Sequence, residues 1–485
     1  MKKKLWILLA ICSMTVLTSC EELLDGLLGA VEDNPVSSSS TNYNYNATIP
    51  DNVYVASVNQ PNATSYMPKH PSQDDVDFID DKVQWEWGKS QRGTERGTTA
   101  YKNMGRAPEI MCKVMAQALG INAINKEQTP ALERLLSRAY RTGEQSAATA
   151  KSYYKRPRPF VVMGESAWYE PDAQDATGSF TSATTAAGWA VGLVFAEMWP
   201  PLQNKILKKA FQFGEDRVIS GSNFQSDVDG GYCSGAAAIA QAHYNNSKLQ
   251  EDILAARTEY KRIAGFASSY DPEAYAGTLN GAKIINSPAP CSSSEPRYEA
   301  DLKRYQNAKT YRTTKRGEQA VMDADASSDR MAAVFGEILG FTISPTNAPH
   351  IYTLIKSIRY KSVDLVNNTK INYFRLRPFA LLNEPTPVPA KESTYRQNSS
   401  YPSGHTCYAW SLGLALAEVA PDRQNKILHR AYDFGFNRVI VGYHWPTDID
   451  AGRVLAASLI AYLHNDDEFC SQIKQAQAEY KKLAK

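Results

Sequence analysis

The chain contains a long internal repeat, which constrains its fold more than any other feature. Three segments recur in the same order in the two halves of the sequence, and the longest pair aligns without a gap. The aligned pairs are residues 202–229 with 423–450, residues 150–160 with 369–379, and residues 92–97 with 312–317. Self-similarity on this scale predicts two copies of one domain, each near the usual domain size.

Both copies have the apolar periodicity of helices. Residues 351–366, for example, place apolar side chains at the helical period, and alternating strand-like runs are few. We therefore predict an all-α protein with two tandem helical-bundle domains, the first copy (residues 72–266) and the second copy (residues 297–485). Residues 267–296 are enriched in Gly, Pro and Ser and are predicted to link the copies.

The N-terminus has the pattern of an export signal. Residues 2–4 are basic, and the apolar run at residues 5–17 is too short to span a bilayer. Residues 17–20, Leu-Thr-Ser-Cys, resemble a bacterial lipobox. Residues 1–20 are thus predicted to be a lipoprotein signal peptide, with Cys20 as the lipidated first residue of the mature protein. An ordinary signal cleaved nearby is the alternative.

Residues 21–71 are predicted to be a flexible tether, because most of this segment is rich in Ser, Asn, Thr and Pro and has little apolar periodicity. A tether after a lipidated cysteine would hold the globular part off a membrane. The sequence therefore predicts an exported protein, lipid-anchored to the bacterial outer membrane, that faces the periplasm or the cell surface.

Composition narrows the remaining classes. A formal net charge of +2 gives no sign of a nucleic-acid-binding surface, and no later stretch is apolar for the length of a transmembrane helix. Outside the signal and Cys20, the sequence has an odd number of cysteines and no Cys-x2-Cys pair, so zinc is not expected and no disulfide is assigned. These cysteines are Cys112, Cys233, Cys291, Cys407 and Cys470.

Three short patterns in the second copy have residue types suited to a phosphoryl group. They are Lys370 followed by Arg377-Pro378, then Pro402-Ser403-Gly404-His405, then Arg438 followed by His444 and Asp448. A phosphoryl dianion needs fixed positive charge, and Lys370, Arg377 and Arg438 supply a point charge and two planar forks. The apolar run at residues 409–420 is long enough for a buried helix, so the fold could bring both of its flanks to one pocket.

The spacing of the first two patterns predicts local structure. Lys370 and Arg377 are seven residues apart, so on a helix that ends near Pro378 they would share one face. Ser403 and Gly404 come just before the apolar run and predict a helix start, where free backbone N–H groups favour an anion. Both groups of donors would then reach the same ligand.

The third pattern supplies an imidazole and a carboxylate. His444 and Asp448 are four residues apart, which is one helical face. The carboxylate could then hold the imidazole in the tautomer that leaves a lone pair free for attack. His405 would remain available as an acid.

Together the three patterns resemble the signature of the type 2 phosphatidic acid phosphatase and vanadium haloperoxidase superfamily. Each pattern alone is common without function, but three in this order rarely arise by accident. The surrounding sequence, with Gly-Tyr-His-Trp at residues 442–445, is most similar to the bacterial class A non-specific acid phosphatases. The resemblance implies helical bundles of that superfamily's type and no metal or other cofactor. It also implies that His444 is the nucleophile, His405 the general acid and base, Asp448 the residue that orients His444, and Lys370, Arg377, Ser403, Gly404 and Arg438 the phosphate-binding residues.

The first copy keeps the positive charges and lacks the histidines. Its residues that align with the site are Lys151, Arg158, Ser182, Thr184, Arg217, Asn223 and Asp227. Thr184 stands in place of His405, and Asn223 in place of His444. Neither side chain exchanges a proton near neutral pH as imidazole does. The first copy is therefore predicted to be inactive.

Two roles remain for such a copy. It could pack against the second copy and cover its apolar surface, or it could bind phosphate without cleaving it, since clustered charges need a partner. Ala183 replaces Gly404 and would narrow the approach of a phosphate to the backbone, which favours packing. Class A relatives are typically assembled from identical subunits, so the copies are predicted to form a pseudo-dimer within the chain, or the chain to form a homo-oligomer.

We predict that the second copy is an acid phosphatase that hydrolyses small phosphate monoesters through a phosphohistidine intermediate. A vanadium-dependent haloperoxidase is one alternative, in which the same residues bind vanadate and His444 is the metal ligand. The other alternative is a non-catalytic surface protein that captures phosphorylated ligands.

Overall fold

The two copies use the same succession of helices, and the all-α prediction is confirmed. The computed structural model describes residues 43–174, 177–244 and 247–484, and these contain helices and no strand. The first copy has α3 (Phe78–Gln91), α4 (Glu95–Lys102), α5 (Pro108–Leu119), α6 (Pro130–Ser146), α7 (Ala148–Tyr154), α8 (Pro159–Val162), α9 (Ala183–Met198), α10 (Gln203–Ser220), α11 (Gln225–His243) and α12 (Ser247–Ile263). The second has α13 (Pro296–Lys309), α14 (Lys315–Met322), α15 (Ser328–Leu339), α16 (Pro349–Lys370), α17 (Pro378–Leu381), α18 (Glu392–Tyr395), α19 (Gly404–Val419), α20 (Gln424–Ile440), α21 (Pro446–Leu463) and α22 (Asp467–Leu483). The single helix α16 takes the place of α6 and α7.

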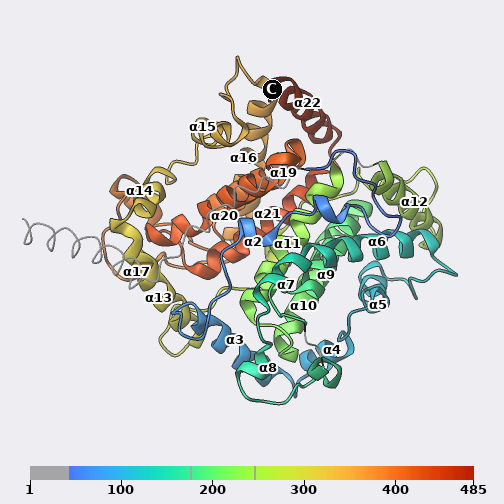
Figure 1. Ribbon diagram of the computed structural model, residues 1–485, viewed down its shortest axis with the longest axis horizontal. Helices are drawn as coiled ribbons and strands as arrows, with labels where there is room; N and C mark the ends of the chain where they lie inside the picture. The colour runs from blue at the N-terminus through green and yellow to red at the C-terminus, as the bar shows by residue number, and fades with distance from the viewer. Residues whose placement is uncertain (1–42, 175–176, 245–246, 485) are drawn as a thin grey trace, which may run out of the picture. The chain divides into compact units, whose positions relative to one another are not determined.

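A buried central helix organises each copy. Helix α9 packs against α6, α10 and α11, and α19 packs against α16, α20 and α21 (Figure 1). Small residues permit this closeness, since a Cβ on Gly192 would lie 2.3 Å from Cβ of Ala210, and one on Gly413 would lie 2.5 Å from Cβ of Ala431. A short turn separates α19 from α20, so α20 runs back along α19. The end of α20 and the start of α21 therefore return to the level of Gly404.

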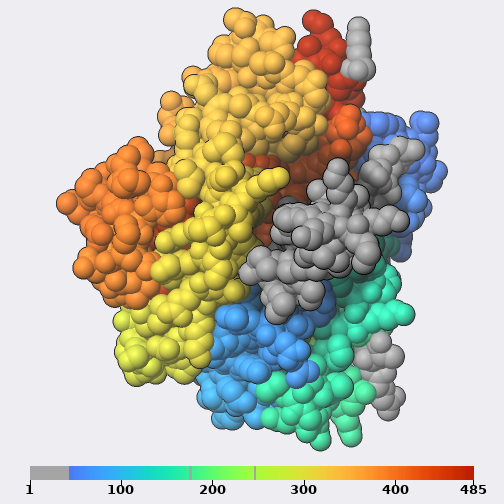
Figure 2. Space-filling model, turned by 60° about the vertical axis from the view of Figure 1, so that its left-hand side comes forward, coloured from blue at the N-terminus to red at the C-terminus, as the bar shows by residue number. Residues whose placement is uncertain are grey.

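The two copies pack directly on each other. Helix α11 contacts α19, and α21 contacts α9. Helix α3 contacts α13, where Arg304 lies 3.4 Å from carboxylate oxygens of both Asp77 and Asp80, and the blue and yellow surfaces meet in Figure 2. The rings of His243 and His464 stack across the copies with centroids 3.6 Å apart. Tyr43–Lys485 is accordingly one compact unit.

Residues 43–66, which we call the strap, are packed against both copies. The Tyr54 hydroxyl donates to Asp252 of the first copy at 2.7 Å, and the Asn62 backbone N–H donates to Asn425 of the second at 2.9 Å. The strap includes α2 (Ala63–Tyr66), which packs against α20, and Tyr66 is fully buried.

The predicted flexible tether is therefore wrong for residues 43–71. A few aromatic and apolar side chains, spaced through a polar sequence, bury enough surface to fix this segment. Residues 21–42, the signal and Cys20 lie outside the described residues.

The connection between the copies is also packed. Within residues 267–296, a short 3-10 helix, Gly281–Lys283, contacts both α10 and α16. Ile284 and Ile285 after it are buried. The connection thus adds to the contact between the copies.

None of the described helices combines the length and apolarity that a membrane crossing requires. The five cysteines within the described part of the chain are free, and Cys112, Cys233 and Cys407 among them are buried.

Candidate active site

A cavity of about 680 Å³ lies at the N-terminal end of α19. The turn between α14 and α15, the C-terminal half of α16 and the loop between α17 and α19 form its walls. Its lining includes five of the eight predicted site residues, Lys370, Arg377, Gly404, His405 and His444. The other three, Ser403, Arg438 and Asp448, are fully buried and do not line it. The volume falls within the range of small-molecule sites.

Lys370 and Arg377 reach this cavity without sharing a helix. Helix α16 ends at Lys370, and Pro378 is the first residue of α17, with Arg377 extended before it. The predicted helix across this segment is wrong, because a proline favours the first position of a helix and forces an extended residue before it. Both cations nevertheless donate to the carbonyl of Ser399, Arg377 at 3.3 Å.

The predicted helix start at Ser403 and Gly404 is confirmed. Ser403 is the N-cap of α19, and its hydroxyl accepts a hydrogen bond from the Thr406 backbone N–H at 3.3 Å. The first N–H groups of a helix have no partner within it, and Gly404 and His405 carry such groups at the cavity. The helix dipole adds partial positive charge at the same place.

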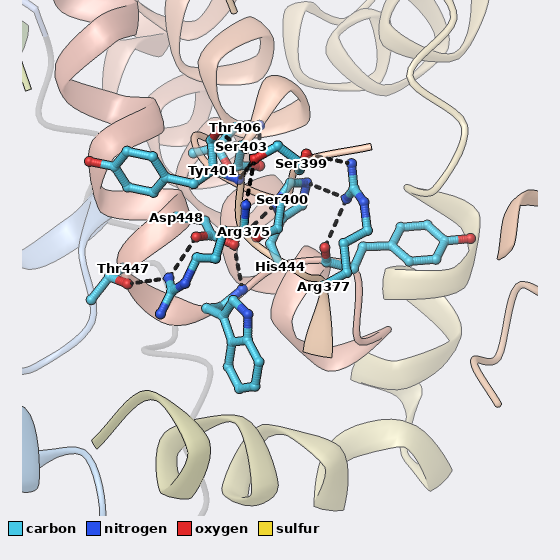
Figure 3. Close-up of polar contacts among 12 residues, drawn as sticks. Arg375, Arg377, Ser399, Ser400, Tyr401, Ser403, Thr406, His444, Thr447 and Asp448 are labelled. Atoms are coloured by element: carbon cyan, nitrogen blue, oxygen red, sulfur yellow. Dashed lines mark hydrogen bonds and ion pairs between the residues drawn. The ribbon is translucent and has the colours of Figure 1, made fainter. Parts of the chain in front are cut away.

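His444 lies in the turn before α21 rather than on the helix, so its predicted placement is wrong. Pro446 is the first residue of α21, and Asp448 in the first turn accepts from the Trp445 backbone N–H at 2.8 Å. The turn still brings Nδ1 of His444 to 3.4 Å from Oδ2 of Asp448 (Figure 3). The predicted pairing is thus present, with a different local structure.

The other ring nitrogen of His444 identifies the tautomer. Nε2 lies 3.1 Å from Nη1 of Arg377. A guanidinium only donates, so Nε2 must hold a lone pair, and the proton of the neutral ring is on Nδ1 beside Asp448. Nε2 is therefore the basic and nucleophilic atom.

His405 faces His444 from the start of α19. Its Nε2 lies 3.2 Å from the Ala324 carbonyl oxygen, which only accepts, so Nε2 carries a proton. The ring lines the cavity and is held from the turn between α14 and α15.

Burial and positive charge set the electrostatics. Burial lowers the pKa of His444 well below its usual value, with Arg377 as the next cause, and burial followed by Arg438 does the same for His405. Burial also lowers the pKa of Lys370 well below its usual value and that of Arg438 to about 10. Nη1 of Arg438 is buried and has no hydrogen-bond partner among the described residues. A bound anion would offset the free-energy cost of keeping these cations charged while they are buried.

Arg375 is a site residue that the sequence reasoning missed. It is buried and donates to Asp448 at 2.8 Å, so it fixes the carboxylate that faces His444 (Figure 3). It also donates to Asp301 at 2.7 Å. The repeat contained a signal for it, because Arg156 stands at the aligned position. Arg156 makes the same pair of contacts in the first copy, to Asp227 and Asp81.

Tyr395 and Asn398 were also missed. The guanidinium of Arg377 lies over the Tyr395 ring, 4.4 Å from its centroid, and donates to Oδ1 of Asn398 at 2.7 Å. Both residues belong to the connection between α17 and α19, Tyr395 as the last residue of α18, and the first copy has Gln174 and Thr177 at the corresponding positions when the two connections are aligned on Ser182 and Ser403.

The aligned residues of the first copy also come together, around a cavity of only about 10 Å³. Its lining is Gly105, Arg106, Lys151, Arg158, Asp172, Ala183, Thr184, Arg217, Ser222 and Asn223. Asn223 donates to the Ser179 carbonyl at 2.9 Å and accepts from Ser182 at 3.2 Å. This amide is thus held by hydrogen bonds at the position where the second copy has the imidazole of His444.

The sequence model of the PAP2 superfamily matches both copies of this chain, at residues 138–250 and 354–469. A non-specific acid phosphatase of Providencia stuartii is 40% identical over 186 residues, which cover 38% of this chain and 75% of that protein. A non-specific acid phosphatase of Salmonella typhimurium is 35% identical over 193 residues, or 40% of this chain and 77% of that protein. An acid phosphatase of Zymomonas mobilis is 32% identical over 193 residues, or 40% of this chain and 73% of that protein.

Proposed function

Because the chain belongs to the PAP2 superfamily, as a tandem duplication, we propose that its second copy is an acid phosphatase that hydrolyses phosphate monoesters. The observation that carries the proposal is the contact between Nε2 of His444 and Nη1 of Arg377, 3.1 Å apart, inside a group of cations that lines a cavity of about 680 Å³. The cations suit a phosphate group, and the remaining volume can hold its alcohol.

Binding would use the cations and the helix start around the cavity. Arg377 and Arg438 present guanidinium groups, Lys370 adds a point charge, and the start of α19 adds backbone N–H groups. These groups stabilise the negative charge on the equatorial oxygens as the phosphoryl group transfers.

Two histidines would then divide the chemistry. Nε2 of His444 attacks phosphorus and forms a P–N bond while the bond to the leaving oxygen breaks, and His405 gives that oxygen a proton. Asp448 stabilises the proton on Nδ1 of His444. In the second step His405 takes a proton from water, whose oxygen displaces His444 and releases inorganic phosphate.

The test is hydrolysis of p-nitrophenyl phosphate by the full chain, with and without EDTA. We expect turnover that EDTA leaves unchanged, and a phosphoenzyme that is stable in alkali and labile in acid, as phosphohistidine is. A vanadium haloperoxidase would instead oxidise bromide when vanadate is added. Bromide oxidation without phosphatase turnover would reject the proposal.

Anchoring belongs to the same proposal, although its residues lie outside the described part of the chain. The lipobox-like residues 17–20 support export and lipidation at Cys20. Wild-type protein from whole cells should partition into a detergent phase, and Cys20→Ala protein should not. Equal partitioning of the two would reject the anchor without affecting the assignment of activity.

A further inference from the structure

We propose that the first copy contains an anion site whose anion is supplied by the chain itself, the carboxylate of Asp172. We call Lys151, Arg158 and Arg217, with the residues between them, the first cage. Asp172 belongs to a short 3-10 helix, Glu170–Gln174, in the loop between α8 and α9, and it is buried. It lines the small cavity together with the three cations of the first cage.

The contact of Asp172 with Ser222 holds the carboxylate at the small cavity of the first cage. The Ser222 hydroxyl donates to Oδ2 of Asp172, while the Ser222 carbonyl accepts from Nη1 of Arg158 at 2.6 Å. Ser222 immediately precedes Asn223, the residue that aligns with His444. Asp172 and Asn223 line the same small cavity, so the carboxylate lies near the residue that replaces the nucleophile.

The charges of the first cage respond to this carboxylate. Burial lowers the pKa of Lys151 to about 7 and that of Arg158 to about 10, with the neighbouring cations as further causes. Carboxylates oppose this lowering of the pKa: Asp227 and then Asp172 at Lys151, Asp172 and then Asp227 at Arg158, and Asp216 and then Asp172 at Arg217. Buried cations need such a partner.

Space excludes a second anion. The cavity of about 10 Å³ can hold roughly one water molecule. The Arg106 side chain helps to fill the first cavity, which it lines. The aligned residue of the second copy is Ala326, which has a much smaller side chain and lines the larger cavity. In the second copy the corresponding loop brings the neutral amide of Asn398 to the cations and leaves the cavity open.

The exchange of Gly404 for Ala183 adds a methyl group that the protein around Gly404 could accommodate. A Cβ on Gly404 would meet only Cγ1 of Val366, at 3.5 Å, which is an ordinary contact. The narrowing of a phosphate's approach by this methyl group stays a prediction, and Ala183 lines the small cavity together with Asp172.

Equilibrium dialysis of the full chain against labelled inorganic phosphate tests the proposal. The quantity compared is the number of phosphate ions bound per chain in the wild type and in each variant. Asp172→Ala should bind one more phosphate per chain than the wild type, and Asp172→Ala with Arg158→Ala should lose that extra phosphate. Glu170→Ala, on an exposed residue of the same short helix, should bind as the wild type does. The increment does not depend on whether the second copy is a phosphatase.

Two results would overturn the proposal. One is a folded Asp172→Ala protein that binds no additional phosphate. The other is a wild-type protein that loses a phosphate when Arg158 alone is replaced, because that would show an external anion in the first cage.

Thermal unfolding gives a second measurement that needs no ligand. Asp172→Ala and Arg158→Ala should each lower the melting temperature, and the double variant should lose less than the sum of the two shifts. A double variant that folds where Asp172→Ala does not would agree with this expectation. Additive shifts would contradict the pairing.

Discussion

The two sites of this chain share their cations and differ in what faces them. In the second copy the cations face two imidazoles and a cavity of about 680 Å³, and in the first they face a carboxylate, an amide and about 10 Å³. The network of Arg375, Asp301 and Asp448 recurs in the first copy, where Asn223 and not a histidine stands at the position of His444. The buried ion pairs that hold the helix ends together are thus common to both copies, whereas the imidazoles and the open cavity, to which we assign the proposed chemistry, belong to the second copy alone.

The largest loss of activity should come from replacing the proposed nucleophile, His444, by the asparagine that the first copy has at that position. His444→Asn should reduce phosphatase turnover about 10⁶-fold, as the loss of a covalent nucleophile does in other hydrolases, and should abolish the phosphoenzyme. The measurement is p-nitrophenyl phosphate hydrolysis with phosphoenzyme trapping. His429→Asn on α20 is the control, because His429 lies outside the site. Residual phosphoenzyme in His444→Asn would refute the role of this residue.

Replacing the proposed general acid, His405, by the threonine that the first copy has at that position should reduce activity less. His405→Thr should lower kcat about 10²–10⁴-fold, the usual contribution of a general acid. The loss should grow as the leaving alcohol becomes more basic, because p-nitrophenolate leaves without a proton more readily than an alkoxide does. A series of aryl and alkyl phosphates measures this slope, and an equal loss for all of them would argue against an acid.

Arg375 should matter through Asp448. Arg375→Met should lower kcat about 10–100-fold, as the loss of a supporting contact typically does, with a smaller change in KM. Arg156→Met, the matched change in the first copy, should lower stability without changing kcat. Equal effects of the two variants on kcat would show that the network is purely structural.

The lowered pKa values predict activity at acid pH. The pKa of His444 lies well below its usual value, so this residue stays an unprotonated nucleophile as the pH falls. The pKa of His405 is also lowered, so its acid form is lost as the pH rises, and kcat/KM should fall about tenfold per pH unit above a break below pH 6.5. This limb should be absent in His405→Thr. A profile that rises into alkali would exclude the acid role.

The smallest effect should come from the remaining difference at the helix start. Gly404→Ala should reduce kcat/KM less than tenfold, because the added methyl group meets only Val366 at 3.5 Å. Kinetics with p-nitrophenyl phosphate and inhibition by inorganic phosphate would measure it. A loss comparable to that of His405→Thr would mean that this methyl group, and not the loop with Asp172, separates the two sites.

Sequence patterns located the second site but not its local geometry. The order of Lys370, Arg377 and His444 could be read because these residues must meet one phosphate, whatever backbone carries them. The helices expected through Arg377 and His444 were wrong, because Pro378 and Pro446 begin new helices just after these residues. Spacing therefore predicted proximity better than it predicted secondary structure.

Contacts made by loops could not be predicted. Asn398 and Asp172 occupy loops of unrelated sequence, and only the folded chain shows that each reaches an arginine cluster. Arg375 differs, since its repeat at Arg156 made it visible in the sequence. The strap was misread because composition averages over a few aromatic side chains such as Tyr54 and Tyr66, which carry most of its burial.

The strap also affects the order in which the protein can be completed during synthesis. Its residues Tyr45, Asn59 and Asn62 bond to Asp422, Gln424 and Asn425, at separations of 363 to 377 residues along the chain. Such contacts cannot form before residues 422–425 have been synthesised, and the entropic cost of closing so long a loop makes them slow to form. While the ribosome is still making the second copy, the strap has only its first-copy surface to bind. The earliest described residues to be synthesised are thus among the last to reach their final contacts.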